Sequence, residues 1–154
     1  ASDTMPLIRA FLDTSALFAA IWSAEGGGRL ALKLGEAGVV QLVVSRQVLA
    51  ELEGALRRKA PASLVSLALL LDRIRVEVAP EPDNDVLTAC EALVNHRGDS
   101  VVVAAAVASR IEYFITPDRK HLLDNARLGA AVPFLIGTPG DFVAWARARL
   151  PRPA

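Results

Sequence analysis

The chain has 154 residues, of which 53% are hydrophobic and 22% charged, enough to bury one well-packed core but too few for two domains. Its 17 Lys and Arg residues balance 17 Asp and Glu residues, which excludes an overall positive field that attracts nucleic acid or anionic membrane. A polyanionic partner must therefore be held by a local site. We expect a single domain over residues 5–150, with an expression-tag remnant at 1–4 and a C-terminal tail at 151–154.

Three features of the sequence bear on where the protein works. The only cysteine, Cys90, cannot form an internal disulfide and falls in a helical pattern, so we interpret it as a small buried apolar residue. The apolar run at 17–22 is too short to span a bilayer, and Asp13 interrupts the stretch where a signal peptide would be apolar. We therefore expect a cytoplasmic protein with no membrane partner.

Short apolar runs and helical patterns alternate along the chain. The first run, LIRAFLD, is followed by polar residues that favour a helix N-cap, and this order of strand and then helix recurs to the end. In chain order we predict a strand at 7–13, helices at 16–22 and 30–37, a strand at 39–44, helices at 47–59 and 64–71, a strand at 76–78, helices at 84–95 and 101–109, a strand at 112–116, an apolar segment at 132–136, and a helix at 138–150.

The alternation predicts the architecture. Strands separated by one or two helices favour an α/β fold, a three-layer α/β/α sandwich around a central parallel sheet of four to five strands. The helix at 101–109 is apolar almost all round and must be buried between other elements. Ligands of such sheets bind at the carboxyl ends of the strands. Asp13 and Asp118 follow the ends of predicted strands, so we expect both at that edge.

Four acidic residues, Asp13, Glu51, Asp99 and Asp118, are the candidate site. Each aspartate stands just before a predicted helix, and taken alone it would be a helix N-cap worth about 1 kcal/mol. Glu51 is different because it lies in the middle of a helix, beside the apolar face, and caps nothing. Its ordinary alternative is a solvated position on the helix surface.

The predicted topology gathers these four carboxylates. Two carboxylates about 4 Å apart repel each other by roughly 1 to 4 kcal/mol, depending on the effective dielectric. A divalent cation removes that repulsion, and oxygen-only ligands with room for water and phosphate oxygens suit Mg²⁺ or Mn²⁺ rather than zinc. Hydrolysis of a phosphodiester is the natural chemistry of such a site.

Four segments of the sequence resemble a known family. FLDTSALFAA, SRQVLAELEGAL, GDSVVVAAAV and EYFITPDRKHLL are similar, in order and spacing, to the four acidic motifs of PIN-domain nucleases. The closing TPGDFVAWA looks like the final helix of the VapC-like members, the toxins of toxin-antitoxin pairs. Each motif alone is weak, whereas four in order on fitting elements are fairly specific.

The resemblance implies a function and a set of site residues. Asp13, Asp99 and Asp118 would bind one or two Mg²⁺ or Mn²⁺ ions, and Glu51 would complete the acidic ring. The activity implied is that of a metal-dependent endoribonuclease, in which hydroxide made from metal-bound water attacks the phosphate in line. RNA would be the substrate, and an antitoxin protein and a second copy of the chain would be partners.

The resemblance also implies roles for residues near the carboxylates. Thr116 and Ser15 would be hydroxyls that orient the acidic side chains. Two departures bear on a second metal: many members have Asn where this chain has Ser15, and an acidic residue where it has Lys120. Lys120, Arg119 and Arg46 are candidates for contacts with RNA phosphates, with a solvated surface charge as the alternative for each.

Other readings of the sequence compete with this one. Receiver and haloacid-dehalogenase-like phosphotransfer domains also have a strand that ends in Asp, but the chain lacks the second aspartate or acidic pair that they use. A PIN fold that binds RNA or an antitoxin peptide without cutting is the alternative from another class, disfavoured by the presence of all four acids. His96 and His121 lack metal-ligand spacing and are interpreted as surface residues, although His121 is close enough to Asp118 to line the cleft.

Overall fold

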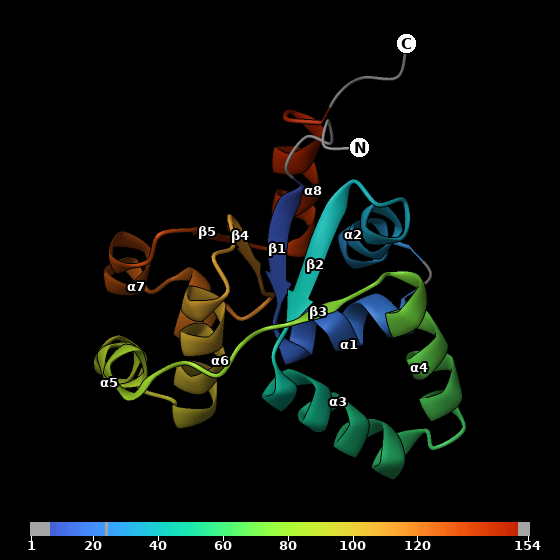
Figure 1. Ribbon diagram of the computed structural model, residues 1–154, viewed down its shortest axis with the longest axis horizontal. Coiled ribbons are helices and arrows are strands. Elements are labelled where there is room, and N and C mark those ends of the chain that lie inside the picture. Colours follow the sequence, from blue (N-terminus) through green and yellow to red (C-terminus); the bar gives the residue numbers. More distant parts are fainter. Residues whose placement is uncertain (1–6, 24, 151–154) are drawn as a thin grey trace.

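In the computed structural model, five parallel strands form one sheet in the order β3-β2-β1-β4-β5 (Figure 1). The described residues are 7–23 and 25–150, so the predicted tag remnant (1–4) and tail (151–154) lie outside them. The chain begins at the centre of the sheet, builds outward to β3, and returns beside β1 to build the other half. The strands are β1 (Ile8–Leu12), β2 (Val40–Val44), β3 (Glu77–Val78), β4 (Tyr113–Ile115) and β5 (Leu135–Gly137).

Helices form the connections between these parallel strands and cover the sheet (Figure 1). The predicted α/β sandwich with a parallel sheet of four to five strands is confirmed. None of the helices in the described part of the chain is long and apolar enough to cross a membrane. The helices are α1 (Thr14–Trp22), α2 (Gly27–Glu36), α3 (Arg46–Lys59), α4 (Ser63–Arg73), α5 (Asn84–Leu93), α6 (Arg97–Ala108), the π-helical turn η1 (Arg119–Leu123), α7 (Ala126–Ala131) and α8 (Pro139–Arg147).

The core lies on both faces of the central strands. Residues pointing to opposite faces of β1, such as Phe11 and Leu12, are equally inaccessible to water, and the same holds along β2. Continuous apolar runs of this kind are typical of parallel strands covered on both sides. Phe11 stacks on Phe114 of β4 with ring centroids 5.3 Å apart, and Phe114 stacks on Phe134 at 5.9 Å. Cys90 is buried on α5, as predicted.

The helix predicted to be buried is confirmed, although it begins earlier than expected. Its residues from Val102 to Ala106 are all buried, while its first residue is Arg97 rather than residue 101. The apolar segment at 132–136 is only partly strand: Val132 is the C-cap of α7, and pairing with β4 begins only at Leu135. The short segments η1 and α7 were not predicted, because five or six residues are too few to show helical periodicity.

The central strands all end at one edge of the sheet, and a helix begins directly after each. α1 begins two residues after β1 ends, and α3 begins two residues after β2 ends. Each of these helices, and η1 beyond β4, is capped by the side chain of the residue before it: Asp13, Ser45 and Asp118. The cap oxygens accept backbone N–H groups that have no partner within the helix. These junctions bring polar side chains together at the carboxyl edge.

Candidate metal centre

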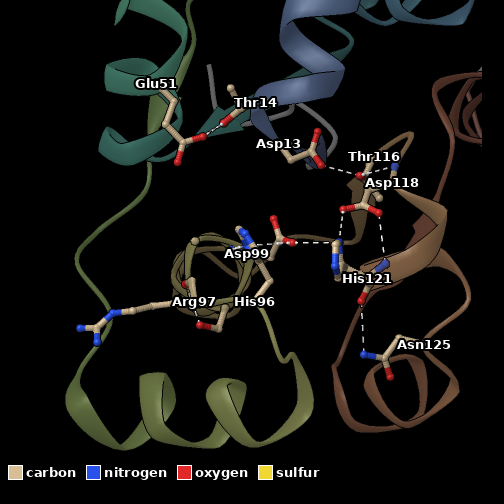
Figure 2. A network of polar contacts seen from close by, with 12 residues as sticks. Asp13, Thr14, Glu51, His96, Arg97, Asp99, Thr116, Asp118, His121 and Asn125 are labelled. Atoms are coloured by element: carbon tan, nitrogen blue, oxygen red, sulfur yellow. Dashed lines mark hydrogen bonds and ion pairs between the residues drawn. The ribbon is translucent and has the colours of Figure 1, made fainter.

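A pocket at the carboxyl edge of the sheet contains all four predicted carboxylates (Figure 2). They come from four separate elements: the β1–α1 junction, the middle of α3, the first turn of α6 and the segment after β4. The structure therefore brings together residues that are up to 105 positions apart, from Asp13 to Asp118. The pocket is lined by Asp13, Thr14, Ser15, Glu51, His96, Gly98, Asp99, Val102, Asp118 and Leu122.

Asp13 is the most deeply placed of the four, with only 7% of its surface exposed. One carboxylate oxygen accepts the backbone N–H of Ala16 at 2.7 Å, and the other accepts the hydroxyl of Thr116. Burial raises the pKa of Asp13 to about 6, and the charges of Asp99 and Asp118 add to the rise. The hydrogen bonds from Thr116 and Ala16 oppose that shift. The native fold thus holds a carboxylate where ionisation is disfavoured unless another charge compensates it.

Thr116 connects two of the acidic residues. Its side chain is fully buried just beyond β4, where its hydroxyl donates to Asp13 and its oxygen accepts the backbone N–H of Asp118 at 3.0 Å. Asp118 in turn caps η1, since its Oδ1 accepts the backbone N–H of His121 at 3.1 Å. The geometry supports the predicted orienting role of Thr116, because one hydroxyl fixes the relative positions of two carboxylate-bearing segments.

Asp99 does not cap its helix, so that part of the sequence interpretation is wrong. The cap is His96, whose Nδ1 accepts the backbone N–H of Asp99 at 3.4 Å, and α6 begins two residues before Asp99. The Asp99 carboxylate is therefore free to face the pocket. Burial raises its pKa; the charges of Asp118 and Glu51 raise it further, whereas His96 and His121 oppose the rise.

Glu51 stands at the exposed side of the pocket, on α3. Its two carboxylate oxygens accept the hydroxyl of Thr14 at 2.6 Å and the side-chain amide of Gln47 at 2.8 Å. Ser15 is exposed and lines the pocket, but within the described residues its hydroxyl donates no hydrogen bond to these carboxylates. Thr14, which was not singled out from the sequence, makes the contact that was expected of Ser15.

Two histidines that were interpreted as surface residues belong to this site. His121 Nδ1 lies 3.2 Å from Asp118 Oδ2 and 3.5 Å from Asp99 Oδ2. His96 Nδ1 lies 3.4 Å from the same oxygen of Asp99, and the two imidazole rings are 5.4 Å apart. The sequence carried a signal for both, since each histidine is three residues from an aspartate, the spacing between an N-cap and the third residue of its helix.

The three basic residues considered for RNA contacts are all exposed, and they come from two different elements, α3 and η1. Arg46 is the first residue of α3 and lines a neighbouring depression with Gln47. Arg119 and Lys120 begin η1, next to Asp118. The basic side chain of Arg97 on α6 points away from the carboxylates (Figure 2).

The donor set fits a divalent cation. Ligand atoms of Asp99, Asp118 and His121 lie within 4.8 Å of one another. Adjacent ligands on an ion with bonds of about 2.1 Å stand about 3 Å apart, close to the separations of His121 from the two carboxylates. Each oxygen of Asp13 has accepted one hydrogen bond and retains a lone pair. Asp13 and Glu51 line the same pocket but are not among these three closely spaced ligand groups.

Comparison with known proteins identifies the family. The chain belongs to the PIN domain family, whose model matches residues 9–120 and so includes all four acidic residues. The family predicted from the acidic motifs is therefore confirmed. A comparison with curated protein sequences gave no match.

Solved structures share the fold at low sequence identity. A chain of VapBC2 from Rickettsia felis, solved bound to a DNA fragment from their promoter, is 17% identical, with a TM-score of 0.62 over 85% of this chain and 98% of that one. PAE2754 from Pyrobaculum aerophilum is 15% identical, with a TM-score of 0.58 over 93% of this chain and 91% of that one. At these identities the likeness establishes the fold.

Proposed function

We propose that this protein is a metal-dependent endoribonuclease that hydrolyses phosphodiester bonds in RNA. The observation that carries the proposal is the convergence of Asp13, Asp99 and Asp118 in one pocket, with Glu51 at its open side. Burial raises the pKa of both Asp13 and Asp99, so a cation that compensates their charge is strongly favoured. Membership of the PIN domain family supports the same reading.

The residues of the pocket have separate roles in the proposed hydrolysis. Asp13, Asp99 and Asp118 would hold a Mg²⁺ or Mn²⁺ ion, which when bound would supply an acidified water and polarise the phosphate. Asp13 is held by its two hydrogen bonds. Thr116 contacts both the Asp13 carboxylate and the backbone N–H of Asp118, and so fixes the position of one aspartate relative to the other. Glu51 stands at the exposed side, where its carboxylate would provide a hydrogen-bond acceptor that orients the attacking water.

RNA must be held by local charge, because the chain has no net charge to attract it. Arg46, Arg119 and Lys120 are exposed on the segments that follow β2 and β4. We assign to them contacts with the phosphates on both sides of the scissile bond. The expected signature is RNA binding that weakens steeply as salt concentration rises.

We extend the proposal to the biological role: a cytoplasmic toxin that works with an antitoxin protein and forms a homodimer. The support is the structural likeness to a chain of VapBC2, of which 98% is covered. Induced expression of the chain in a bacterial host should arrest growth, whereas the Asp99→Asn variant should not. Growth arrest by both forms would contradict a toxin that acts through this pocket.

The test of the enzymatic activity is a cleavage assay on a mixture of RNA and single-stranded DNA with Mn²⁺. Wild-type protein should cut the RNA, and EDTA or Asp99→Asn should abolish cutting. Asp72→Asn on α4 is the matched control, because this aspartate is exposed and lies outside the pocket. Cleavage that survives EDTA or Asp99→Asn would contradict the assignment, and RNA binding without any cleavage would favour a non-catalytic RNA- or antitoxin-binding PIN module.

A further inference from the structure

We propose that His121 binds the metal ion directly through Nδ1, which makes this pocket a mixed nitrogen-and-oxygen site that prefers Mn²⁺ and other transition metals to Mg²⁺. The inference rests on the proposed function, because it concerns the metal of the same pocket. It changes the oxygen-only donor set expected from the sequence. It also predicts which ion the protein selects.

Three potential ligand atoms, one each from His121, Asp118 and Asp99, lie close together. Its Nδ1 lies 3.2 Å from one oxygen of Asp118 and 3.5 Å from one oxygen of Asp99. Adjacent ligands of a six-coordinate ion stand about 3 Å apart, so all three atoms can reach one ion with small movements. The ring is 36% exposed and the two carboxylates 26% and 27%, which leaves room for water or phosphate on the open side.

The local backbone explains why the ring points at the carboxylates (Figure 2). η1 is a π-helical turn in which the backbone N–H of Leu123 donates to the carbonyl of Asp118, five residues back. Such turns are rare and occur frequently at functional sites. The backbone of His121 is anchored at both polar groups: its N–H donates to Asp118 Oδ1, and its carbonyl accepts the Asn125 side-chain amide at 3.3 Å. The imidazole is thus positioned before any ion binds.

His96 provides the comparison within the same pocket. Its Nδ1 is as close to Asp99 as that of His121, at 3.4 Å, but this nitrogen accepts the backbone N–H of Asp99. The hydrogen-bond partner of His121 Nδ1 is Asp118 Oδ2, at 3.2 Å, which is itself a proposed ligand of the ion. Its side chain is 60% exposed. We therefore assign His96 to positioning Asp99, and the metal-binding nitrogen to His121.

An imidazole ligand has a predictable effect on metal choice. Mg²⁺ favours oxygen ligands and retains its waters, whereas imidazole nitrogen suits transition metals, whose affinity rises from Mn²⁺ through Co²⁺ to Ni²⁺. Wild-type protein should therefore bind Mn²⁺ at least about tenfold more tightly than Mg²⁺, and Co²⁺ more tightly still. Replacing His121 by Ala should lower Mn²⁺ affinity by about 10- to 100-fold and affect Mg²⁺ much less.

The experiment is pulsed electron paramagnetic resonance of Mn²⁺ bound to the full chain without a polyhistidine tag, combined with calorimetric titrations of Mg²⁺, Mn²⁺ and Co²⁺. The chain has only two histidines, so a nitrogen coupling of imidazole type that persists in His96→Asn must come from His121. Asparagine retains an acceptor for the helix cap. His121→Ala should lose the coupling, and if that variant does not fold, His96→Asn alone decides the question.

The outcomes separate this inference from the proposed function. Mn²⁺ bound without nitrogen coupling, or coupling lost in His96→Asn, would overturn the role of His121 while leaving the carboxylate site intact. No binding of Mn²⁺ at all would overturn both. Coupling in wild type and His96→Asn, with Mn²⁺ preferred to Mg²⁺, is the expected result.

Discussion

Replacing Asp13 by Asn should stabilise the metal-free protein at neutral and alkaline pH, although it removes a residue of the proposed site. Asp13 is only 7% exposed, and burial raises its pKa to about 6 from the ordinary value of 3.8. An Asn side chain keeps an oxygen that can accept the N–H of Ala16, and Asn is among the best N-cap residues. It carries no charge to be buried.

The magnitude and the pH window follow from the pKa shift. A rise of about 2 units, at about 1.36 kcal/mol per unit, corresponds to about 3 kcal/mol in the free energy of unfolding. Because the folded pKa is raised, the stability that Asp13 contributes is fully present below pH 3.8 and is lost as pH rises through about 6. The advantage of Asp13→Asn should therefore be absent near pH 3.8, grow towards pH 6 and remain constant above it.

The assay is urea unfolding of both proteins in EDTA at several pH values between about 4 and 8, with the exposed Asp72→Asn as a control that should change little. Mn²⁺ should then raise the melting temperature of wild type more than that of Asp13→Asn, since a ligand bound by the native state stabilises it. Equal or lower stability of Asp13→Asn at pH 8 without metal would refute the argument from burial. An equal shift with Mn²⁺ would refute the role of Asp13 in binding.

Three further substitutions test separate parts of the account. Thr116→Val removes the hydroxyl that connects Asp13 to Asp118 and should lower the rate of RNA cleavage by about 10- to 100-fold, whereas an unchanged rate would contradict its orienting role. Leu52→Ala empties a fully buried position on α3 and should lower the free energy of unfolding by about 2–5 kcal/mol in urea titrations; a change under about 1 kcal/mol would be inconsistent with its burial. Lys120→Ala should reduce the slope of log affinity for RNA against log salt by about 0.7, and an identical slope would show that this side chain contacts no phosphate.

The sheet was predictable from the sequence because its strands are buried on both faces. β1 and β2 are apolar runs interrupted only by Arg9 and Gln41, and a helical pattern separates each strand from the next. The bounds of β5 could not be read from the apolar segment at 132–136, because Phe134 is apolar and buried without belonging to a strand. Burial of a side chain and pairing of its backbone are different properties. Only burial can be inferred directly from the residue type.

The four acidic residues were predictable from their order, but their surroundings were not. Asp13 and Asp118 each cap a helix and also line the pocket or its edge, so for these two residues the helix-cap interpretation and the site interpretation are both correct descriptions of position. The orientation of His121 depends on the π-helical turn, and a five-residue turn leaves no periodic pattern. Likewise, the cap of α6 is His96, a residue that is not among the preferred N-cap types.

The most direct test of the metal centre is anomalous X-ray diffraction from crystals of the wild-type protein containing Mn²⁺. We predict an anomalous peak within about 2.5 Å of carboxylate oxygens of Asp99 and Asp118, in the pocket that Asp13 lines. A peak elsewhere on the chain, or none in this pocket at a saturating Mn²⁺ concentration, would contradict the account.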